Sequence, residues 1–330
     1  MARPPKNPHI PMRNGVSPSS LALPSLRQPP WDTVLDALAA LLPRIPAAEW
    51  HARMARGQVL DERGAALPPD APYQRYQRLY YWRELPAEQP IPFRHTVLFQ
   101  DEHLLVADKP HFLPMTPGGR YVQETLLVRL KHELNLPDLS PLHRLDRETA
   151  GVVAFCLRPQ DRDAYQRLFR ERRMHKVYEA VAPWQAGMVF PLERRSTLRE
   201  DESRFFRMRE LSDQEAADST NPPNATTRVE LVTRLTQLTP GNATELALYR
   251  LYPVTGKRHQ LRVHMAALGL PILHDQFYPD VVKAPDEDED FSQPPLQLLG
   301  RELSFTDPVT GAQRRFVSTR QLAAAAVAGL

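Results

Sequence analysis

One carboxylate in a basic loop is the residue of this sequence best placed to do chemistry. Asp146 lies between Arg144 and Arg147 in the segment HRLDRETAG, residues 143–151, immediately before an apolar run. Neighbouring guanidinium groups favour an ionised carboxylate, which suits a nucleophile or a general base better than a general acid. A loop carboxylate held in a structural salt-bridge network explains the same residues equally well. The segment alone leaves both interpretations open.

A second segment, TGKRHQLRVHMAALGLPI at residues 255–272, places cations beside an apolar helical stripe. Arg258 and Arg262 are four residues apart, so we expect them on one helix face. The start of a cationic helix has free backbone N–H groups that bind phosphate or a carboxylate from another segment. A capped core helix with a solvated charged end is the alternative. The stripe consists of Leu261, His264, Met265 and Leu268, and the candidate cations are Lys257, Arg258, His259 and Arg262.

Two further segments carry residue types that contact nucleic acids. In KVYEA, residues 176–180, the ring of Tyr178 is able to stack on a base, although a core tyrosine is the commoner explanation. The helix predicted over residues 160–173 has an apolar stripe and many arginines around it. These arginines are either phosphate ligands or a solvated helix face. They are Arg162, Arg167, Arg170, Arg172 and Arg173.

Hydrophobic patterning predicts an α+β domain over residues 91–320, with a mixed, largely antiparallel sheet and flanking helices. A hairpin signal pairs residues 96–100 with 104–107, and residues 122–134 carry leucines on one helical face. An acidic run, Asp286–Asp290, is expected in a solvated loop. Later strands are expected in pairs, which are residues 228–238 with 245–251 around Thr239–Asn242, and residues 296–305 with 313–317 around Pro308–Gly311.

The first 85 residues are expected to form an arm and a small module. Residues 1–30 are rich in Pro, Ser and Arg without periodicity, which predicts a flexible arm. Residues 31–85 contain two short helical patterns, a turn at residues 61–64 and the stretch YQRYQRLYYWR at residues 73–83. The aromatic residues and arginines of that stretch either lie against bases and phosphates or pack as an ordinary strand.

Composition excludes several classes of protein. The chain has 330 residues with 42% hydrophobic content, which is enough for a globular core. Its formal net charge is +3, so a nucleic-acid footprint would be a local patch. The single cysteine excludes a disulfide framework and a zinc deaminase, and no P-loop, GxGxxG or HExxH motif occurs. Neither a membrane span nor a signal peptide is evident, so we expect a cytoplasmic protein.

Together and in this order, the segments resemble the RluA family of RNA pseudouridine synthases. HRLDRETAG is similar to the family motif HRLDRxTSG, HKVYEA to its KxYxA strand, and TGKRHQLRVH to its GRTHQIRVH segment. DEHLLVADKP at residues 101–110 and LQLLGRELSF at residues 296–305 are similar to its first and last sheet motifs. The resemblance covers about residues 95–318, and the combination is specific where each motif alone is not.

The resemblance implies isomerisation of uridine to its C-glycoside in structured RNA, either rRNA or tRNA, with no metal and no organic cofactor. It implies that Asp146 is the catalytic carboxylate, that Tyr178 stacks on the target base and that Arg262 pairs with Asp146. Arg144 would contact phosphates or fill the space left by a flipped nucleotide, and Leu299 would be an apolar wall of the uracil pocket. The residues then expected to contact RNA are Lys257, Arg258, His259, Arg170 and Arg173.

The chain departs from the family pattern at the pocket edge and in its N-terminal part. Ala150 stands where the family has Ser, His274 where it has Gly, and Leu299-Gly300 where it has His-Ala. Residues 31–85 are only weakly similar to an S4 RNA-binding domain.

Two other functions fit parts of the sequence. A catalytically silent RNA-binding or ribosome-assembly factor would keep the same fold, but the intact Asp146, Tyr178 and Arg262 argue against it. Glycoside hydrolysis would require a second carboxylate acting with Asp146, and none stands out. A monomer is expected for a chain of this size.

Overall fold

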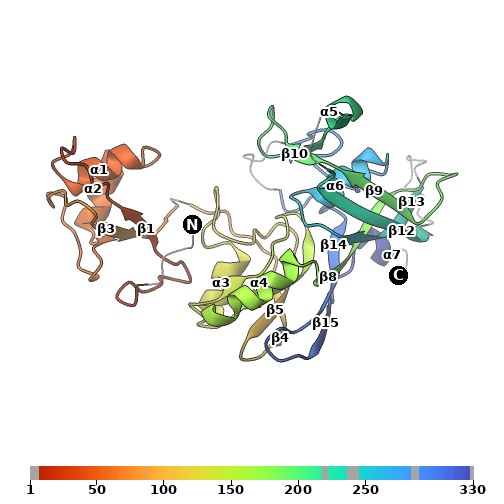
Figure 1. Cartoon of the computed structure of the whole chain (residues 1–330), viewed down its shortest axis with the longest axis horizontal. Helices are drawn as coiled ribbons and strands as arrows, with labels where there is room; N and C mark the ends of the chain where they lie inside the picture. Colours follow the sequence, from red (N-terminus) through yellow and green to blue (C-terminus); the bar gives the residue numbers. More distant parts are fainter. Residues whose placement is uncertain (1–6, 86, 218–221, 236–244, 284–289, 328–330) are drawn as a thin grey trace. The chain divides into compact units, whose positions relative to one another are not determined.

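The computed structural model describes residues 7–85, 87–217, 222–235, 245–283 and 290–327. The chain forms two compact units, which can be followed by colour in Figure 1. Unit 1 comprises Met1–Gln89 and Thr116–Pro137, and unit 2 comprises Pro90–Met115 and Asp138–Leu330. The chain therefore enters unit 2, returns to unit 1 for one segment and then completes unit 2.

Unit 1 contains an antiparallel sheet of order β1-β3-β2 and short helices. Helix α1 begins at a capping box, in which the side chains of Thr33 and Asp36 each accept from the other's backbone N–H. Trp50 of α2 and Leu79 of β3 are fully buried in the core. Both predicted helices are therefore confirmed. The elements are β1 (Ser19–Ala22), α1 (Val34–Leu41), α2 (Ala47–Ala55), β2 (Val59–Leu60), β3 (Arg78–Tyr81) and α3 (Leu126–Glu133).

The prediction of a flexible arm over residues 1–30 was wrong for residues 7–30. Strand β1 pairs with β3 in antiparallel register, so the backbone of this segment completes a sheet edge. Residues 1–6 lie outside the described residues. A few apolar side chains anchor the segment although they show no periodicity in the sequence. These buried side chains are Ile10, Val16 and Leu23.

The prediction of one continuous domain over residues 91–320 was also wrong, because Thr116–Pro137 belongs to unit 1. Val128 on the apolar face of α3 packs in one buried cluster with Ile10 and Val16. The 3.6-residue periodicity correctly predicts the helix, but it does not state which apolar surface the helix will cover.

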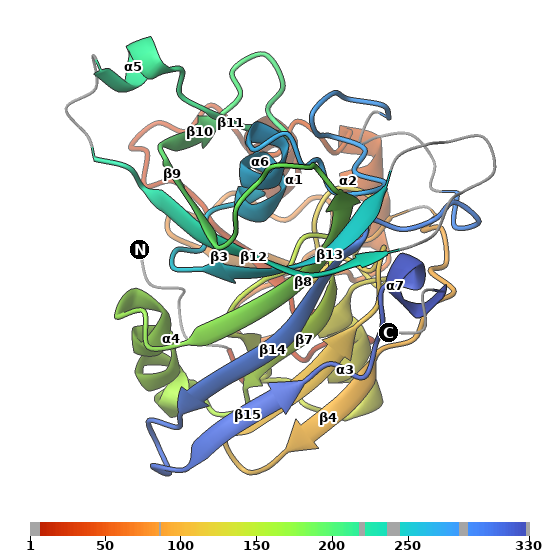
Figure 2. The same ribbon diagram turned by 90° about the vertical axis from the view of Figure 1, so that its right-hand side faces the viewer.

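Unit 2 is built on a mixed sheet that has ten strands in the described part of the chain (Figure 2). Its main path is β4-β5-β7-β14-β8-β13-β12-β9, with β15 paired to β14 and β6 paired to β7. Among these described strands, only β7 and β14 pair in parallel, which confirms the predicted α+β class with a largely antiparallel sheet. The ten strands are β4 (Thr96–Gln100), β5 (Leu104–Lys109), β6 (Ser140–Pro141), β7 (Ala150–Cys156), β8 (His175–Pro183), β9 (Leu192–Ser196), β12 (Ala225–Leu235), β13 (Leu246–Pro253), β14 (Leu298–Thr306) and β15 (Gln313–Val317). Two further strands, β10 (Leu198–Glu200) and β11 (Met208–Glu210), pair in a separate two-stranded sheet. The helices are the 3₁₀ turn η1 (Pro159–Asp161), α4 (Arg162–Arg170), α5 (Asp213–Ala217), α6 (Gln260–Ala267) and α7 (Ala323–Val327).

The strand pairs predicted from the sequence are confirmed. Antiparallel ladders join β4 to β5, β12 to β13 and β14 to β15. The turn predicted at Thr239–Asn242 lies outside the described residues, as does the acidic run Asp286–Asp290 except for its last residue.

Strands β7 and β14 meet at two glycines, just after the loop that carries Asp146. Gly151 has a φ of 123°, and a Cβ atom there would lie 2.3 Å from the carbonyl oxygen of Gly300. Only a residue without a side chain permits this approach. The contact fixes the point at which the Asp146 loop joins the sheet.

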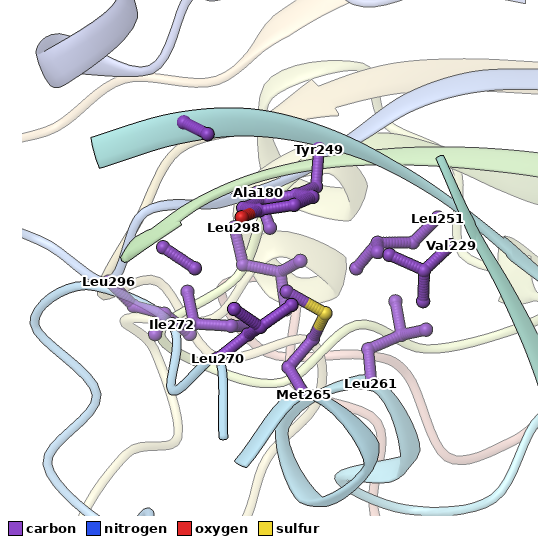
Figure 3. Packing of buried hydrophobic residues seen from close by; sticks show 12 residues of the cluster. Ala180, Val229, Tyr249, Leu251, Leu261, Met265, Leu270, Ile272, Leu296 and Leu298 are labelled. Carbon is purple, nitrogen blue, oxygen red and sulfur yellow. The ribbon is translucent and has the colours of Figure 1, made fainter. Parts of the chain in front are cut away.

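Helix α6 is held against the sheet by an apolar core (Figure 3). Leu261 and Met265 of the helix pack with Tyr249 and Leu251 of β13 and with Leu298 of β14. Burial of each such side chain stabilises the fold by about 1.5–3 kcal/mol. This packing sets the orientation of α6 and therefore the direction of Arg262.

Candidate active site

A cavity of about 320 Å³ opens in unit 2 where three segments meet. The Asp146 loop, strand β8 and the segment before α6 supply most of its wall. Its lining includes His143, Arg144, Leu145, Asp146, Lys176, Tyr178, Lys257, Arg258, His259, Arg262 and Leu298. Candidate residues from three separate motifs of the sequence are thus brought together.

The Asp146 carboxylate faces buried cations across the cavity. Its side chain is 23% exposed, and its Oδ2 lies 3.8 Å from Nη1 of Arg262 and 4.0 Å from Nε2 of His259. Its backbone oxygen accepts from the N–H of Thr149, which closes the loop as a tight turn. No ion pair joins Asp146 to Arg144 or Arg147 among the described residues, so its cationic partners come from α6 and the residue before it rather than from its own motif.

The Asp146 loop is held by the fully buried Lys109 and by two half-buried histidines, His111 and His143. Lys109 Nζ donates to the carbonyl oxygens of Pro110, Leu113 and Arg147. Burial lowers the pKa of Lys109 to about 7, although the nearby Glu148 and Asp146 charges oppose this. The His111 ring donates to the carbonyl oxygen of Glu148 at 2.6 Å, and His143 Nε2 accepts from Ala154 N at 3.2 Å. Burial lowers the pKa of His111 to about 4 and that of His143 to about 3.

Arg262 is fixed by the carboxylate of Asp275, which lies outside the motifs predicted to form the site. Asp275 accepts from Nε at 2.8 Å and from Nη2 at 2.7 Å, and both side chains are buried. Asp275 itself is held by the backbone N–H groups of Phe277 and Tyr278. Burial disfavours the charged guanidinium, but the hydrogen bonds and charge of Asp275 outweigh it and raise the pKa of Arg262. A buried arginine needs a buried anion, and that requirement is the signal that would have revealed Asp275.

The remaining guanidinium nitrogen of Arg262 points at two carboxylates. Nη1 is buried and forms no hydrogen bond with the described residues, and it lies 3.5 Å from Glu148 and 3.8 Å from Asp146. Burial alone would raise the pKa of Glu148, but the charges of Arg147 and Arg262 lower it to about 2. The predicted Arg262–Asp146 pairing therefore exists as a charge contact, while the hydrogen bonds of Arg262 go to Asp275.

Tyr178 presents its ring to the cavity from β8. The strand register places it opposite Gly300 of β14, so the missing side chain of Gly300 leaves room for the ring. Burial and the nearby Asp146 charge raise the pKa of Tyr178, so the phenol is neutral at physiological pH. The ring is half-buried and lines the same cavity as Asp146.

The prediction that Leu299 forms an apolar wall of the pocket was wrong by one residue. Leu298 lines the cavity, whereas Leu299 is fully buried in another cluster with Ala150 and Leu322. Successive side chains of a strand point to opposite faces, and Leu298 pairs with Ala180 on the face where Gly300 meets Tyr178. Motif spacing located the strand but not the face of each side chain.

The segment before α6 does not continue the helix. His259 has a φ of 52°, in the left-handed region, and α6 begins only at Gln260, so the prediction that Arg258 and Arg262 share a helix face was wrong. The side chain of Gln260 accepts from Lys257 N and from Thr255 Oγ1, which folds the segment into a turn. The backbone N–H of Lys257 is therefore not free to bind phosphate.

The three cations of this turn have different environments. Lys257 is exposed at the cavity. Arg258 donates to the carbonyl oxygens of Phe205 and Phe206 at 3.3 and 2.5 Å. His259 is buried and its Nδ1 lies 2.9 Å from the hydroxyl of Tyr278. Burial lowers the pKa of His259, although Asp146 opposes the effect.

The predicted RNA-contacting arginines divide into two groups. Arg144 is exposed, lines the cavity and has no hydrogen-bond or ion-pair partner among the described residues. Arg170 and Arg173 are exposed but do not line the cavity. Arg170 pairs with Asp163 at 3.0 Å, and Arg173 lies 3.4 Å from Glu171. Of these three, Arg144 alone is placed at the mouth of the site.

Lys176 lines the cavity, although it was not among the predicted site residues. Its Nζ has one hydrogen-bond partner among the described residues, the carbonyl oxygen of Thr255 at 3.4 Å. Burial lowers the pKa of Lys176. Its position two residues before Tyr178 on a strand, hence on the same face, was the available signal.

No group of three or more His, Cys, Asp or Glu side chains in the described part of the chain is arranged to hold a metal ion. Within those same ranges, no helix is both long enough and apolar enough to cross a bilayer.

Comparison with known proteins decides the family. A family model described as RNA pseudouridylate synthase matches residues 103–267. The dual-specificity RNA pseudouridine synthase RluA of Haemophilus influenzae is 32% identical over 221 residues, which cover 67% of this chain and 90% of that relative. The chain belongs to the RluA family of RNA pseudouridine synthases. It is thus a member of a family of isomerases that act on RNA.

One further relative is an RNA pseudouridine synthase, and one solved structure shares the fold. An uncharacterised RNA pseudouridine synthase of Synechocystis is 32% identical over 230 residues, covering 69% of this chain and 73% of that protein. The structure of human RNA pseudouridylate synthase domain containing 1 shares the fold, with a TM-score of 0.54 at 22% identity over 71% of this chain and 86% of that one. The family match begins at residue 103, so the resemblance of residues 31–85 to an S4 domain is not confirmed.

Proposed function

We propose that this RluA-family enzyme isomerises a flipped uridine of structured RNA with Asp146 as its catalytic carboxylate. One observation carries the proposal. Asp146 lies in a cavity of about 320 Å³, 3.8 Å from a buried arginine whose direction is fixed by a second carboxylate. A charged carboxylate with limited exposure and a preorganised cation is suited to nucleophilic or general-base chemistry.

The reaction needs no external reactant. The N1–C1′ bond of uridine breaks, the uracil turns, a C5–C1′ bond forms, and the proton on C5 is lost while N1 is protonated. An oxygen of Asp146 either attacks C1′ of the ribose, forming a bond that breaks again when C5 attacks C1′, or assists cleavage of the N1–C1′ bond without bonding to the ribose. Arg262 keeps this carboxylate charged and aimed, and the ring of Tyr178 stacks on the turning base.

Lys176 and Arg144 supply the cations that hold the flipped nucleotide. Nζ of Lys176 reaches the cavity with one weak partner, and Arg144 is exposed at its mouth. A phosphate beside either cation gains a charge-assisted hydrogen bond. A nucleotide taken out of its helix requires such contacts to offset the lost stacking.

The test replaces Asp146 by Asn and measures tritium release from RNA labelled with 5-tritiated uridine, prepared from cells that lack this protein. Release should stop, while the affinity for RNA, measured by filter binding, should change little. Glu193→Gln is the matched control, because Glu193 is an exposed carboxylate outside the cavity. Substantial residual release from Asp146→Asn would contradict the proposed mechanism.

A catalytically silent RNA-binding factor remains the second candidate. It predicts that the wild-type protein binds RNA from the deficient cells and releases no tritium from it. The buried Arg262–Asp275 pair argues against it, since a binding surface alone has no need for a preorganised cation beside Asp146.

The proposal also covers the class of target RNA and the oligomeric state of the protein. We infer that the substrate is a structured rRNA or tRNA and that the protein acts as a monomer. Mapping pseudouridines in RNA from cells with and without the protein identifies the site, and gel filtration of the active fraction measures its size.

A further inference from the structure

The loop between β10 and β11, residues 201–207, projects beside the candidate active site and has no role in the chemistry proposed above. The two strands form a small antiparallel sheet of their own. Figures 1 and 2 both place it next to α6. Phe205 in this loop is 79% exposed, which is unusual for a large aromatic side chain.

The loop is tied to the mouth of the cavity by Arg258. This arginine lines the cavity and donates from both terminal nitrogens to the carbonyl oxygens of Phe205 and Phe206. Arg207 adds a hydrogen bond to the carbonyl oxygen of Pro279 at 2.8 Å. Two arginines therefore hold the loop in place while the ring of Phe205 remains in solvent.

An unbroken series of ring contacts joins Phe205 to the catalytic carboxylate. The ring centroids of Phe205 and Phe206 are 5.7 Å apart, those of Phe206 and Phe277 5.3 Å, and those of Phe277 and His259 6.0 Å. Nε2 of His259 lies 4.0 Å from Asp146. Phe205 is thus the exposed end of a series of contacting rings, and the buried end, His259, lies beside Asp146.

The loop is also ordered by its own hydrogen bonds. Backbone bonds run from Arg204 N to Asp201 O and from Arg207 N to Arg204 O, and Ser203 bonds to the Asp201 carboxylate. A ring presented on an ordered turn binds without a large further loss of conformational entropy.

We propose that Phe205 stacks on an unpaired base of the substrate RNA next to the target uridine, and that Arg258 positions it. The charges of residues 199–207 cancel, with three arginines against three acidic residues, so this loop does not attract phosphate as a cluster of cations would. Its distinguishing feature is the aromatic ring, which binds the face of any base. The proposal rests on the proposed function, because the base it binds neighbours the uridine held at Asp146.

The first test compares Phe205→Ala with Phe205→Trp on the full-length protein. Phe205→Ala should weaken RNA binding and raise KM about tenfold, with a smaller change in kcat, since one base–aromatic stack is lost. Phe205→Trp should restore binding to at least the wild-type value. Val189→Ala is the matched control, because Val189 is also 79% exposed in unit 2 but outside this loop, and it should change neither quantity.

The second test addresses Arg258 as a positioning residue. Arg258→Ala should raise KM as Phe205→Ala does, and the double variant should be little worse than either single one, because both act on the same ring. Additive effects would contradict the positioning role.

The outcomes separate this proposal from the proposed function. If the wild-type protein releases tritium and Phe205→Ala has wild-type RNA affinity and KM, the stacking proposal is overturned and the proposed function stands. If the wild-type protein releases none and Phe205→Ala still binds the RNA about tenfold more weakly, RNA stacking is supported and the proposed function fails.

Discussion

The floor and the rim of the cavity use the same types of charged residue in opposite ways. At the floor, Arg262 is buried against Asp275 and faces Glu148 and Asp146 at 3.5 and 3.8 Å. At the rim, Arg144 is exposed and has no ion-pair partner among the described residues. The floor arginine is held among several fixed charges, whereas the rim arginine is exposed to water.

The different burial of these two arginines indicates which kinetic property the floor and the rim each control. A buried cation keeps its charge only if anions surround it, so its position is fixed before substrate arrives. An exposed cation costs little to place and is screened by salt, so it contributes to affinity and to its ionic-strength dependence. We therefore expect substitutions at the floor to lower kcat and those at the rim to raise KM.

The largest effect is expected at Asp275. Asp275→Asn leaves the Arg262 charge buried without its paired anion, which should cost about 3–5 kcal/mol in the free energy of unfolding. A displaced guanidinium should also lower kcat about 100-fold, since small misplacements of that kind reduce rates to this degree. Urea unfolding and tritium release measure the two quantities.

The control for this prediction is an ion pair at the surface, in which one partner is exposed and the other half-buried. Glu302→Gln removes the partner of Arg315, whose side chain is 69% exposed, and should cost under about 1 kcal/mol without changing kcat. Equal losses in stability for the two variants would erase the distinction between the floor and the surface.

The next effect concerns three histidines with a lowered pKa, two of which, His111 and His143, hold the Asp146 loop. Burial lowers the pKa of His111 and of His264 to about 4 and that of His143 to about 3, from an ordinary value of 6.5. The unfolded chain therefore binds protons first as the pH falls, so stability is full above about pH 6.5 and is lost between pH 6.5 and 4. Glu148, with its pKa at about 2 instead of 4.5, adds a loss of the same sign at lower pH.

His264→Gln tests this pH dependence. His264 is buried, with its ring nitrogens 2.9 Å from Thr227 Oγ1 and 3.0 Å from Ser196 Oγ, and a neutral amide can keep part of this bonding. The slope of unfolding free energy against pH between 6.5 and 4 should become shallower by up to about 1.4 kcal/mol per pH unit. Urea unfolding at several pH values measures it, and an unchanged slope would show that His264 does not contribute.

A third effect is expected at Tyr178, where the floor contacts the base. Tyr178→Phe retains the ring and should keep most of the activity, because no hydrogen bond to its hydroxyl occurs within the described residues. Tyr178→Leu removes the stacking face and should lower kcat/KM. The decrease should correspond to a loss of about 1–3 kcal/mol of transition-state binding. Steady-state tritium release compares them, and equal losses in both variants would mean that the hydroxyl has a chemical role.

The smallest effects are expected at the rim. Arg144→Ala and Lys257→Ala should each weaken RNA binding a few-fold and reduce the slope of log affinity against log salt by about 0.7 per lost phosphate contact. Arg170→Ala on α4 should have less effect, because Asp163 offsets its charge. Binding titrations at several salt concentrations rank them. A larger loss of RNA affinity for Arg170→Ala than for Arg144→Ala would show that the RNA contacts α4 rather than the cavity mouth.

Local sequence patterns predicted most elements of unit 2 but not the boundaries of the units. The strand pairs β12–β13 and β14–β15 follow from alternation and turn residues, which are local properties. The placement of α3 with unit 1 depends on which apolar surface its Val128 meets. The packing of residues 7–30 depends on a free sheet edge at β3 and on isolated apolar residues, neither of which has a periodic signature.

The sequence predicted several of the residues that line the candidate site but not which of them contact one another. Asp146, Tyr178, Arg262 and Arg144 do line one cavity. Leu298, not Leu299, lines the cavity, because successive side chains of β14 point to opposite faces of the sheet. Asp275, not Asp146, is the hydrogen-bond partner of Arg262. Arg258 lies outside helix α6, because the left-handed backbone of His259 separates it from the helix. Its side chain therefore reaches the loop that carries Phe205.

The sequence by itself determined the family, the order of the motifs and the residue types needed for the chemistry, since these reside in short segments whose local patterns are readable. Only the tertiary structure decided which charges are paired, which side chains face the cavity and where the N-terminal segment packs. The physical reason is that burial and pairing depend on distances between residues far apart in the chain, such as Arg262 with Asp275 and Gly151 with Gly300. These contacts convert a set of plausible residues into a floor and a rim with different functions.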